Sequence, residues 1–138
     1  MSRRLCWLDP DRFRRVLINI FDNACQAISA RVGAPHVAPH TAGQLQIVST
    51  CIDSDVYIAI RDNGVGMAPE VLANIFEPLY STKVFGVGLG LTIVREIVRQ
   101  HGGDIRVTSQ PGDGSEVELC LPQSICPRVD HGVDNGCG

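Results

Sequence analysis

Apolar positions recur at helical spacing over residues 12–30, directly after Asp9 and Pro10. These two residues are typical of a helix start, as an N-cap and a first-turn residue. The spacing predicts a helix whose apolar stripe faces a sheet. The stripe comprises Leu17, Phe21, Ala24 and Ile28, with Ile20 beside it. Residues 31–43, rich in Gly, Pro, Ala and His, are expected to form a loop.

Two pairs of segments show strand patterns instead. Residues 45–52 and 56–62 are rich in β-branched side chains and flank a polar turn, which predicts a hairpin. Residues 105–109 and 116–121 alternate about a Pro-Gly-Asp-Gly turn and predict a second hairpin.

The segment between the hairpins predicts two further helices. A short one is expected to start near Pro69, followed by an irregular stretch as far as Lys83. A longer one is expected over residues 89–101, because Gly102 and Gly103 are a natural C-terminal stop. Its apolar face comprises Ile93, Val94, Ile97 and Val98.

The order helix, hairpin, helix, hairpin predicts an α+β fold in which helices cover one face of a mostly antiparallel sheet. A length of 138 residues, with 44% hydrophobic and 20% charged residues, is ordinary for one globular domain. Because periodicity stops after Pro122, the domain is expected to cover residues 1–122 and residues 123–138 to form a disordered tail.

The charge and hydropathy of the chain exclude several classes of partner. The net charge of -3 offers no basic excess, so neither nucleic acid nor an anionic membrane is expected as a partner. No stretch approaches the about 18 to 20 apolar residues of a spanning helix, and no signal-peptide pattern opens the chain. These features predict a cytoplasmic protein without membrane insertion. The neighbouring arginines are interpreted as a solvated helix face: Arg3, Arg4, Arg12, Arg14 and Arg15.

The six cysteines include no Cys-x-x-Cys pair, and no histidine stands at zinc-finger spacing from them. Neither a metal site, a redox motif nor a disulfide framework is therefore predicted. Cys25, Cys51 and Cys120 lie in apolar periodic segments and are expected to be small buried hydrophobic residues.

Two asparagines of the first predicted helix are candidates for chemistry. Asn19 and Asn23 are four residues apart and share one face, expected to be exposed and turned away from Leu17 and Phe21. A carboxamide oxygen suits Mg²⁺, which takes its remaining oxygens from water and phosphates. Alone, the pair fits an ordinary solvated helix surface equally well.

A further candidate is Asp62, which ends a predicted strand and is followed by Gly64 and Gly66. Glycines there allow a close backbone approach to a ligand or a positive φ. An ionised carboxylate can accept a hydrogen bond from the exocyclic amine of adenine, where guanine has a carbonyl. A plain strand-end turn would show the same residue types.

The segment Gly86-Val87-Gly88-Leu89-Gly90-Leu91 opens the long second helix. Free N–H groups and the positive end of the helix dipole favour phosphate binding there. The glycine spacing fits neither the dinucleotide fingerprint nor a P-loop, and glycines that only allow close helix packing remain the alternative. Just ahead of it, Thr82 and Lys83 end a stretch that could act as a lid, with the lysine either neutralising phosphate charge or simply solvated.

Together and in this order, these segments resemble the four boxes of the histidine-kinase catalytic domain, in the ATPase superfamily shared with gyrase, Hsp90 and MutL. The boxes are an N box at 16–24, a first glycine box at 62–66, an F box at 76–83 and a second glycine box at 86–91, with a closing Gly-Asp-Gly-Ser turn at 112–115. The resemblance spans residues from about 5 to 122, and the F box is most similar to that of nitrogen-regulation-type sensor kinases.

The resemblance implies the Bergerat fold, a two-layer α/β sandwich in which about three helices back a mixed, mostly antiparallel sheet. It implies that Asn23 coordinates Mg²⁺, Asn19 assists at the phosphates, Asp62 binds the adenine amine and Ser115 lies near the adenine. The remaining ATP-binding residues implied by the boxes are Gly64, Gly66, Thr82, Lys83, Gly86, Val87, Gly88, Leu89, Gly90 and Leu91. Gln26 departs from the pattern, because many members have a basic residue there.

A histidine kinase also needs a phosphoacceptor histidine on a dimerisation helix, and none of His36, His40, His101 and His131 has that context. The chain is therefore expected to donate the γ-phosphate of Mg·ATP to a histidine on a separate dimerisation and phosphoacceptor domain. It would indirectly serve a response regulator, and a monomer is expected in isolation. No glutamate stands at Asn19, where gyrase-like hydrolases activate water.

Two alternatives remain open. An anti-sigma-factor serine kinase of the same superfamily also works without a dimerisation helix, although that class usually lacks the full F box. A non-catalytic nucleotide-binding interaction module would bind ATP without transferring its phosphate.

Overall fold

The computed structural model describes residues 8–31, 42–77 and 90–122. Both predicted hairpins and all three predicted helices are confirmed, with ends that shift by one or two residues. Along the chain the elements are α1 (Pro10–Arg31), β1 (Leu45–Ile52), β2 (Asp55–Asp62), α2 (Pro69–Leu72), α3 (Gly90–Gln100), β3 (Asp104–Gln110) and β4 (Gly114–Pro122).

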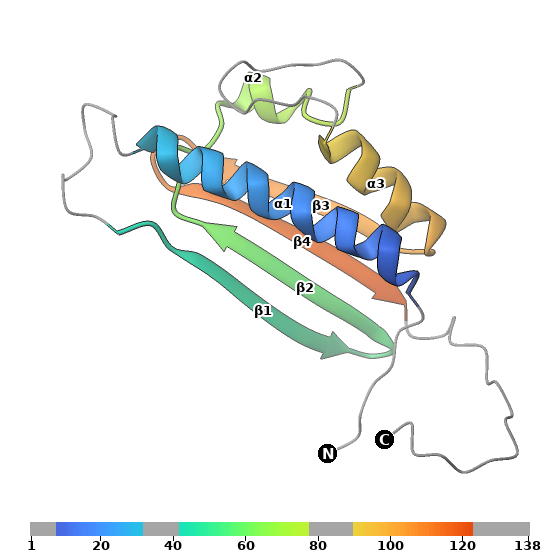
Figure 1. Cartoon of the computed structure of the whole chain (residues 1–138). Helices are drawn as coiled ribbons and strands as arrows, with labels where there is room; N and C mark the ends of the chain where they lie inside the picture. The colour runs from blue at the N-terminus through green and yellow to red at the C-terminus, as the bar shows by residue number, and fades with distance from the viewer. Residues whose placement is uncertain (1–7, 32–41, 78–89, 123–138) are drawn as a thin grey trace, which may run out of the picture.

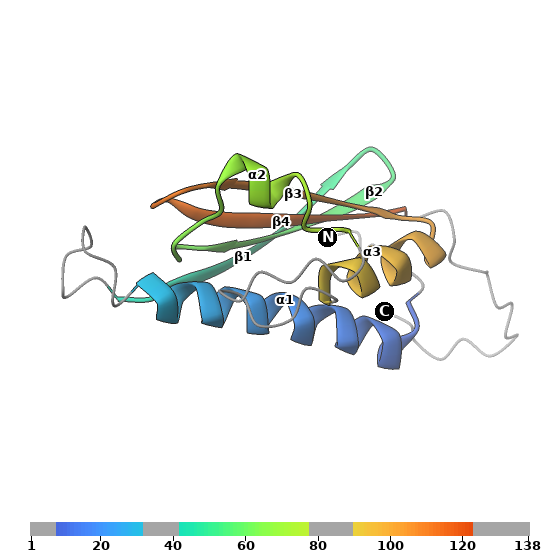
Figure 2. The same cartoon turned by 90° about the horizontal axis from the view of Figure 1, so that it is seen from above.

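The elements form two layers, a sheet and the helices α1 and α3 on one of its faces (Figure 1), and the short helix α2 lies next to β3. The strand order is β1-β2-β4-β3, and each of these neighbouring pairs is antiparallel. The predicted α+β sandwich is confirmed, although the sheet of the described residues is wholly antiparallel and not mixed. The view from above shows α1 and α3 side by side beneath the sheet (Figure 2), with α1 packed on β2 and β4 and α3 on β3. Every residue of β1 is exposed, since this edge strand extends beyond the helices.

One apolar cluster joins the two layers. It comprises Val16, Ile20, Ile60, Val94, Ile97, Val98, Leu119 and Leu121, from α1, β2, α3 and β4. The face that α1 buries is Val16, Ile20, Ala24 and Ala27. The predicted stripe was therefore wrong by about one residue around the helix: Leu17, Phe21 and Ile28 are only partly buried. The cause is that α1 packs against α3 as well as the sheet, so the most buried positions lie between these two contacts.

The ends of the long helices are closed by local hydrogen bonds. The carboxylate of Asp9 accepts the backbone N–H groups of Asp11 and Arg12 at 3.0 and 3.2 Å, which confirms it as the N-cap of α1. At the end of α3, the N–H groups of Gly102 and Gly103 donate to the carbonyls of Arg99 and Val98 in a Schellman arrangement. The predicted glycine stop is therefore confirmed.

The cysteine prediction was wrong. Cys25 and Cys51 are exposed and Cys120 is half-buried, because the first points away from the sheet and the second lies on the uncovered strand β1. All three are free thiols. By contrast, Arg12, Arg14 and Arg15 are exposed, as a solvated helix face requires.

The described helices include none with the length and apolar character needed to cross a membrane. The predicted tail and part of the predicted lid lie outside the described residues, so the boundary at residue 122 stays a prediction.

Candidate functional site

Asp62 ends β2, and its side chain is buried, with 8% of its surface exposed. One of its carboxylate oxygens accepts the N–H of Gly64 at 2.9 Å. Burial raises the pKa of Asp62, while hydrogen bonds from the backbone N–H groups of Gly64 and Ser115 act in the opposite direction. An ionised carboxylate has more lone pairs than these bonds use, so it can also accept from a ligand amine.

Ser115 lies directly opposite Asp62 in the β2–β4 ladder. The hydroxyl of Ser115 is 2.8 Å from that of Ser109, which donates to the carbonyl of Gly114 and accepts the N–H of Met67. Since a hydroxyl has one proton, Ser115 must then donate to Ser109. Its lone pairs remain free, so Ser115 offers a second acceptor next to Asp62.

The first glycine loop is held between α1 and the β3–β4 turn. The N–H of Val65 donates to the carbonyl of Ala27 at 3.1 Å, and the carbonyl of Val65 accepts the N–H of Gly112 at 2.7 Å. A Cβ on Gly64 would lie 2.6 Å from the backbone of Ala27. Gly66 has a φ of 71°, and a Cβ there would lie 1.9 Å from the carbonyl oxygen of Gln110. Both glycines are thus required by contacts within the protein.

Asn19 and Asn23 lie on α1 where its buried face meets its exposed face. Both are half-buried, so the prediction of a fully exposed face was wrong. At 100° per residue, Asn23 is only about 40° around the helix from Ala27, which is buried. Neither side-chain amide hydrogen-bonds to another of the described residues.

The second glycine segment and the lid are described only at their ends. Gly90 begins α3, and Leu91 after it is half-buried. At the other end, Phe76 of the F box is fixed to α3, because its carbonyl accepts the hydroxyl of Thr92 at 3.0 Å and its ring lies 5.1 Å from the guanidinium of Arg95. The predicted site residues outside the described ranges are Thr82, Lys83, Gly86, Val87, Gly88 and Leu89.

Comparison with known proteins places this geometry in a family. The chain matches the model for the histidine kinase-, DNA gyrase B- and HSP90-like ATPases over residues 8–125. The chain belongs to this family. It is 40% identical over 124 residues to the sensor histidine kinase ZraS of Escherichia coli (strain K12), covering 90% of this chain and 24% of ZraS. It is 38% identical over 114 residues to the sensory histidine kinase/phosphatase NtrB of Escherichia coli O157:H7, covering 83% of this chain and 32% of NtrB.

Solved structures agree with this assignment. The catalytic domain of the histidine kinase ThkA is 29% identical with a TM-score of 0.65, over 86% of this chain and 70% of that one. Full-length ShkA in complex with AMPPNP is 30% identical with a TM-score of 0.69, over 87% of this chain and 23% of that one. The resemblance seen in the sequence is thus confirmed. The chain spans only about a quarter of the length of ZraS and a third of that of NtrB.

Sequence reasoning missed several residues that build this ATPase domain's site. Ser109 connects the first glycine loop to Ser115, and its place opposite Ser115 across the predicted turn was the available signal. Thr92 and Arg95 are three residues apart on one helix face, which allows both to contact Phe76. Gln26, already noted in the sequence as a departure from the family pattern, has a buried Oε1 without a hydrogen-bond partner among the described residues.

The raised pKa of Asp62 leads to a prediction about the free energy of unfolding. The folded-state pKa of Asp62 is raised above its unfolded-state value of about 3.9. At neutral pH the ionised carboxylate therefore lowers the free energy of unfolding, and this destabilisation disappears as the pH falls below about 3.9. Asp62→Asn keeps an oxygen for the N–H of Gly64 and has no charge. We expect its free energy of unfolding in urea at pH 7 to equal or exceed that of the wild type, with the difference shrinking towards about pH 4.

The matched control is Asp113→Asn, in the neighbouring turn, where the carboxylate is exposed and stability should change little at either pH. A loss of more than about 2 kcal/mol in Asp62→Asn alone would show that the charge of Asp62 stabilises the fold.

Proposed function

We propose that this domain binds Mg·ATP and donates the γ-phosphate to a histidine on a separate dimerisation and phosphoacceptor domain. The observation that carries the proposal is the buried carboxylate of Asp62 opposite Ser115, at the end of β2 in a member of this ATPase family. Two acceptors side by side suit the exocyclic amine of adenine and a water beside it. Guanine has a carbonyl at that position, and its oxygen would face the carboxylate.

The residues present also fit a magnesium ion at the phosphate end of the site. The described residues hold no group of three or more His, Cys, Asp or Glu side chains that could bind a metal. Mg²⁺ does not need such a group, since it keeps several waters and shares oxygens with the phosphates of the nucleotide. We propose that the amide oxygen of Asn23 is the protein ligand of Mg²⁺ and that Asn19 lies beside the phosphates.

The amides of the second glycine segment, residues 86–91, would complete the phosphate site, with Thr82 and Lys83 on the lid. Gly64, whose N–H donates to Asp62, and Gly66 would shape the site beside that carboxylate. Support comes from α3, which begins at Gly90 and so presents free N–H groups and the positive end of its dipole at the end of the second glycine segment. When bound, Mg²⁺ would neutralise phosphate charge. The protein itself would orient the nucleotide and exclude water.

Transfer to histidine needs little further chemistry from the protein. A neutral imidazole is already a nucleophile near pH 7, so positioning and charge stabilisation are the main requirements. The structure of ShkA is a complex with AMPPNP, and ZraS and NtrB are named as histidine kinases. By analogy we propose a phosphoacceptor domain as the direct partner, in cis or in trans, and a response regulator as the indirect one.

The same proposal includes a monomeric domain in isolation, a location in the cytoplasm and no insertion into the membrane. It also includes a domain that ends near residue 122. These points rest on the same family analogy and on the sequence patterns described above.

Binding specificity tests the nucleotide site. We expect Asp62→Asn to weaken ATP binding about 30-fold or more in calorimetry, because its NH₂ group can face the adenine amine, and two opposed donors cost about 2 kcal/mol. Asp113→Asn serves as the control and should bind ATP like the wild type. Equal affinity of the wild type for ATP and GTP, or unchanged ATP binding by Asp62→Asn, would contradict the assignment.

Phosphotransfer tests the reaction. The domain is incubated with radiolabelled ATP, Mg²⁺ and the isolated phosphoacceptor domain of ZraS or NtrB, and the label on the acceptor is measured after acid treatment. We expect labelling that acid removes, as for phosphohistidine, and none on an acceptor whose histidine is replaced by glutamine. Acid-stable label would instead support a serine kinase, and binding without transfer to any acceptor would support a non-catalytic module.

A further inference from the structure

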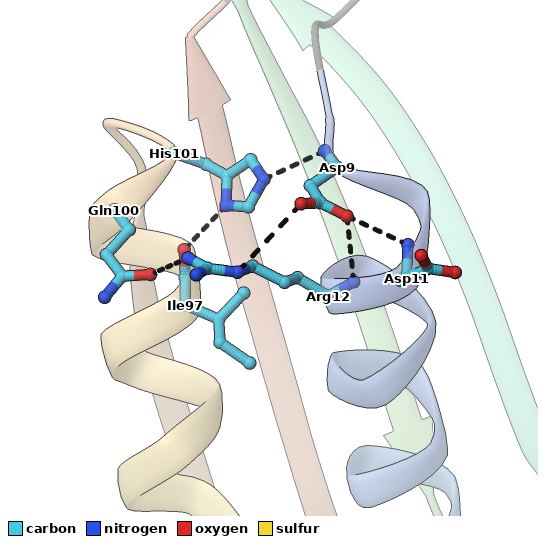
Figure 3. Close-up of polar contacts among 6 residues, drawn as sticks. All are labelled: Asp9, Asp11, Arg12, Ile97, Gln100 and His101. Atoms are coloured by element: carbon cyan, nitrogen blue, oxygen red, sulfur yellow. Dashed lines mark hydrogen bonds and ion pairs between the residues drawn. The ribbon is translucent and has the colours of Figure 1, made fainter.

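His101 completes the cap of α1 from the far end of α3. In a capping box, the side chain three residues after the N-cap accepts the N–H of the N-cap residue. That residue is Arg12 here, which has no acceptor. The N–H of Asp9 donates instead to Nε2 of His101 at 3.0 Å, across 92 residues of sequence (Figure 3).

These contacts define one protonation state of the ring. Nδ1 lies 2.7 Å from the carbonyl oxygen of Ile97, which can only accept, so Nδ1 has the proton. Nε2 accepts from Asp9 and therefore has none. His101 is buried, with 8% of its surface exposed, and its ring is neutral in this arrangement. A protonated ring would turn an N–H towards the N–H of Asp9, and this hydrogen bond would be lost.

The bond joins the two helices that the candidate site depends on. α1 starts at the Asp9 end and continues to Asn19 and Asn23, whereas α3 starts at the second glycine segment and ends at His101. Arg12 donates to the side-chain oxygen of Gln100 beside it, so the same two helix ends are connected twice (Figure 3). Fixing these ends sets how α1 lies along α3.

We propose that neutral His101 is a positioning residue for the nucleotide site and that its protonation loosens α1 from α3 and weakens nucleotide binding. The inference rests on the proposed function for the identity of the ligand. The hydrogen bonds themselves are independent of that function. A mildly acidic medium would thus lower ATP affinity through a group at the opposite end of both helices.

Charged groups stand near this contact on three elements, either at the Asp9 cap or within three residues of His101 in sequence. They are Asp9, Asp11 and Arg12 at the start of α1, Arg99 at the end of α3 and Asp104 at the start of β3. Arg12 pairs with Asp9 at 4.0 Å, and Arg99 pairs with Asp104 at 3.6 Å. Because the carboxylate of Asp9 also caps α1, an imidazolium that turned to pair with it would compete with the backbone N–H groups of the first turn.

The test compares two substitutions at this position. His101→Gln keeps an oxygen that can accept from Asp9 and cannot be protonated near neutral pH. The carbonyl of Ile97 stays satisfied, since it also accepts the backbone N–H of His101. His101→Leu removes the acceptor. The control replaces His36, His40 and His131 together by Gln. ATP affinity is measured by calorimetry between about pH 5.5 and 7.5.

At the upper pH we expect His101→Leu to bind ATP about five-fold more weakly than the wild type, and His101→Gln to bind like it. Towards the lower pH, the wild type and the triple control should approach His101→Leu, while His101→Gln should change less. The ionisation of ATP changes the affinity of all variants equally, so it does not affect the comparison between them at one pH. Should His101→Leu fail to fold, His101→Gln against the wild type still decides the outcome.

Identical pH profiles for the wild type and His101→Gln would overturn the proposal. So would ring ¹⁵N spectra that show the Nε2–H tautomer at neutral pH. A wild-type domain that binds no ATP at any pH would contradict the proposed function. In that case the ring spectra, and urea unfolding of the same variants over the same pH range, still decide whether neutral His101 holds α1 to α3.

Discussion

The β2–β4 ladder, with α1 and α3 packed on it, determines where the described parts of the candidate site lie. Its antiparallel register sets Asp62 opposite Ser115, at the end of the two central strands where β2 ends and β4 begins. The same two strands contribute Ile60, Leu119 and Leu121 to the apolar core on which both helices pack. Binding geometry and stability are therefore coupled, because a shift of register would separate the acceptors and expose the core.

The glycines show how far this coupling extends. Gly64 and Gly66 stand where a nucleotide site is expected, yet their lack of a Cβ is required by Ala27 and by the carbonyl of Gln110. Contacts within the protein therefore hold the loop between α1 and the β3–β4 turn. Such preorganisation lowers the entropy that binding must remove. A substitution at either glycine would change stability and affinity together, whereas Asp62 allows the two to be separated.

Sequence patterns predicted the elements of this fold because each has a clear period and clear end signals, such as Asp9 before α1. They failed where the outcome depends on what covers a surface: Cys51 lies in a strand pattern but on an edge that no helix reaches. The candidate site was predictable as an ordered set of motifs. The hydrogen bonds of Ser109 and His101 were not, because they join segments that only the folded chain brings together.

The proposed function requires Asp62 and Asn23 to hold opposite ends of one Mg·ATP molecule. A crystal structure of the domain with AMPPNP and Mg²⁺ would show this directly. We expect the adenine amine within hydrogen-bond distance of the Asp62 carboxylate, and Mg²⁺ on the amide oxygen of Asn23 at about 2.1 Å. A nucleotide bound away from Asp62, or a metal ion without contact to Asn23, would contradict it.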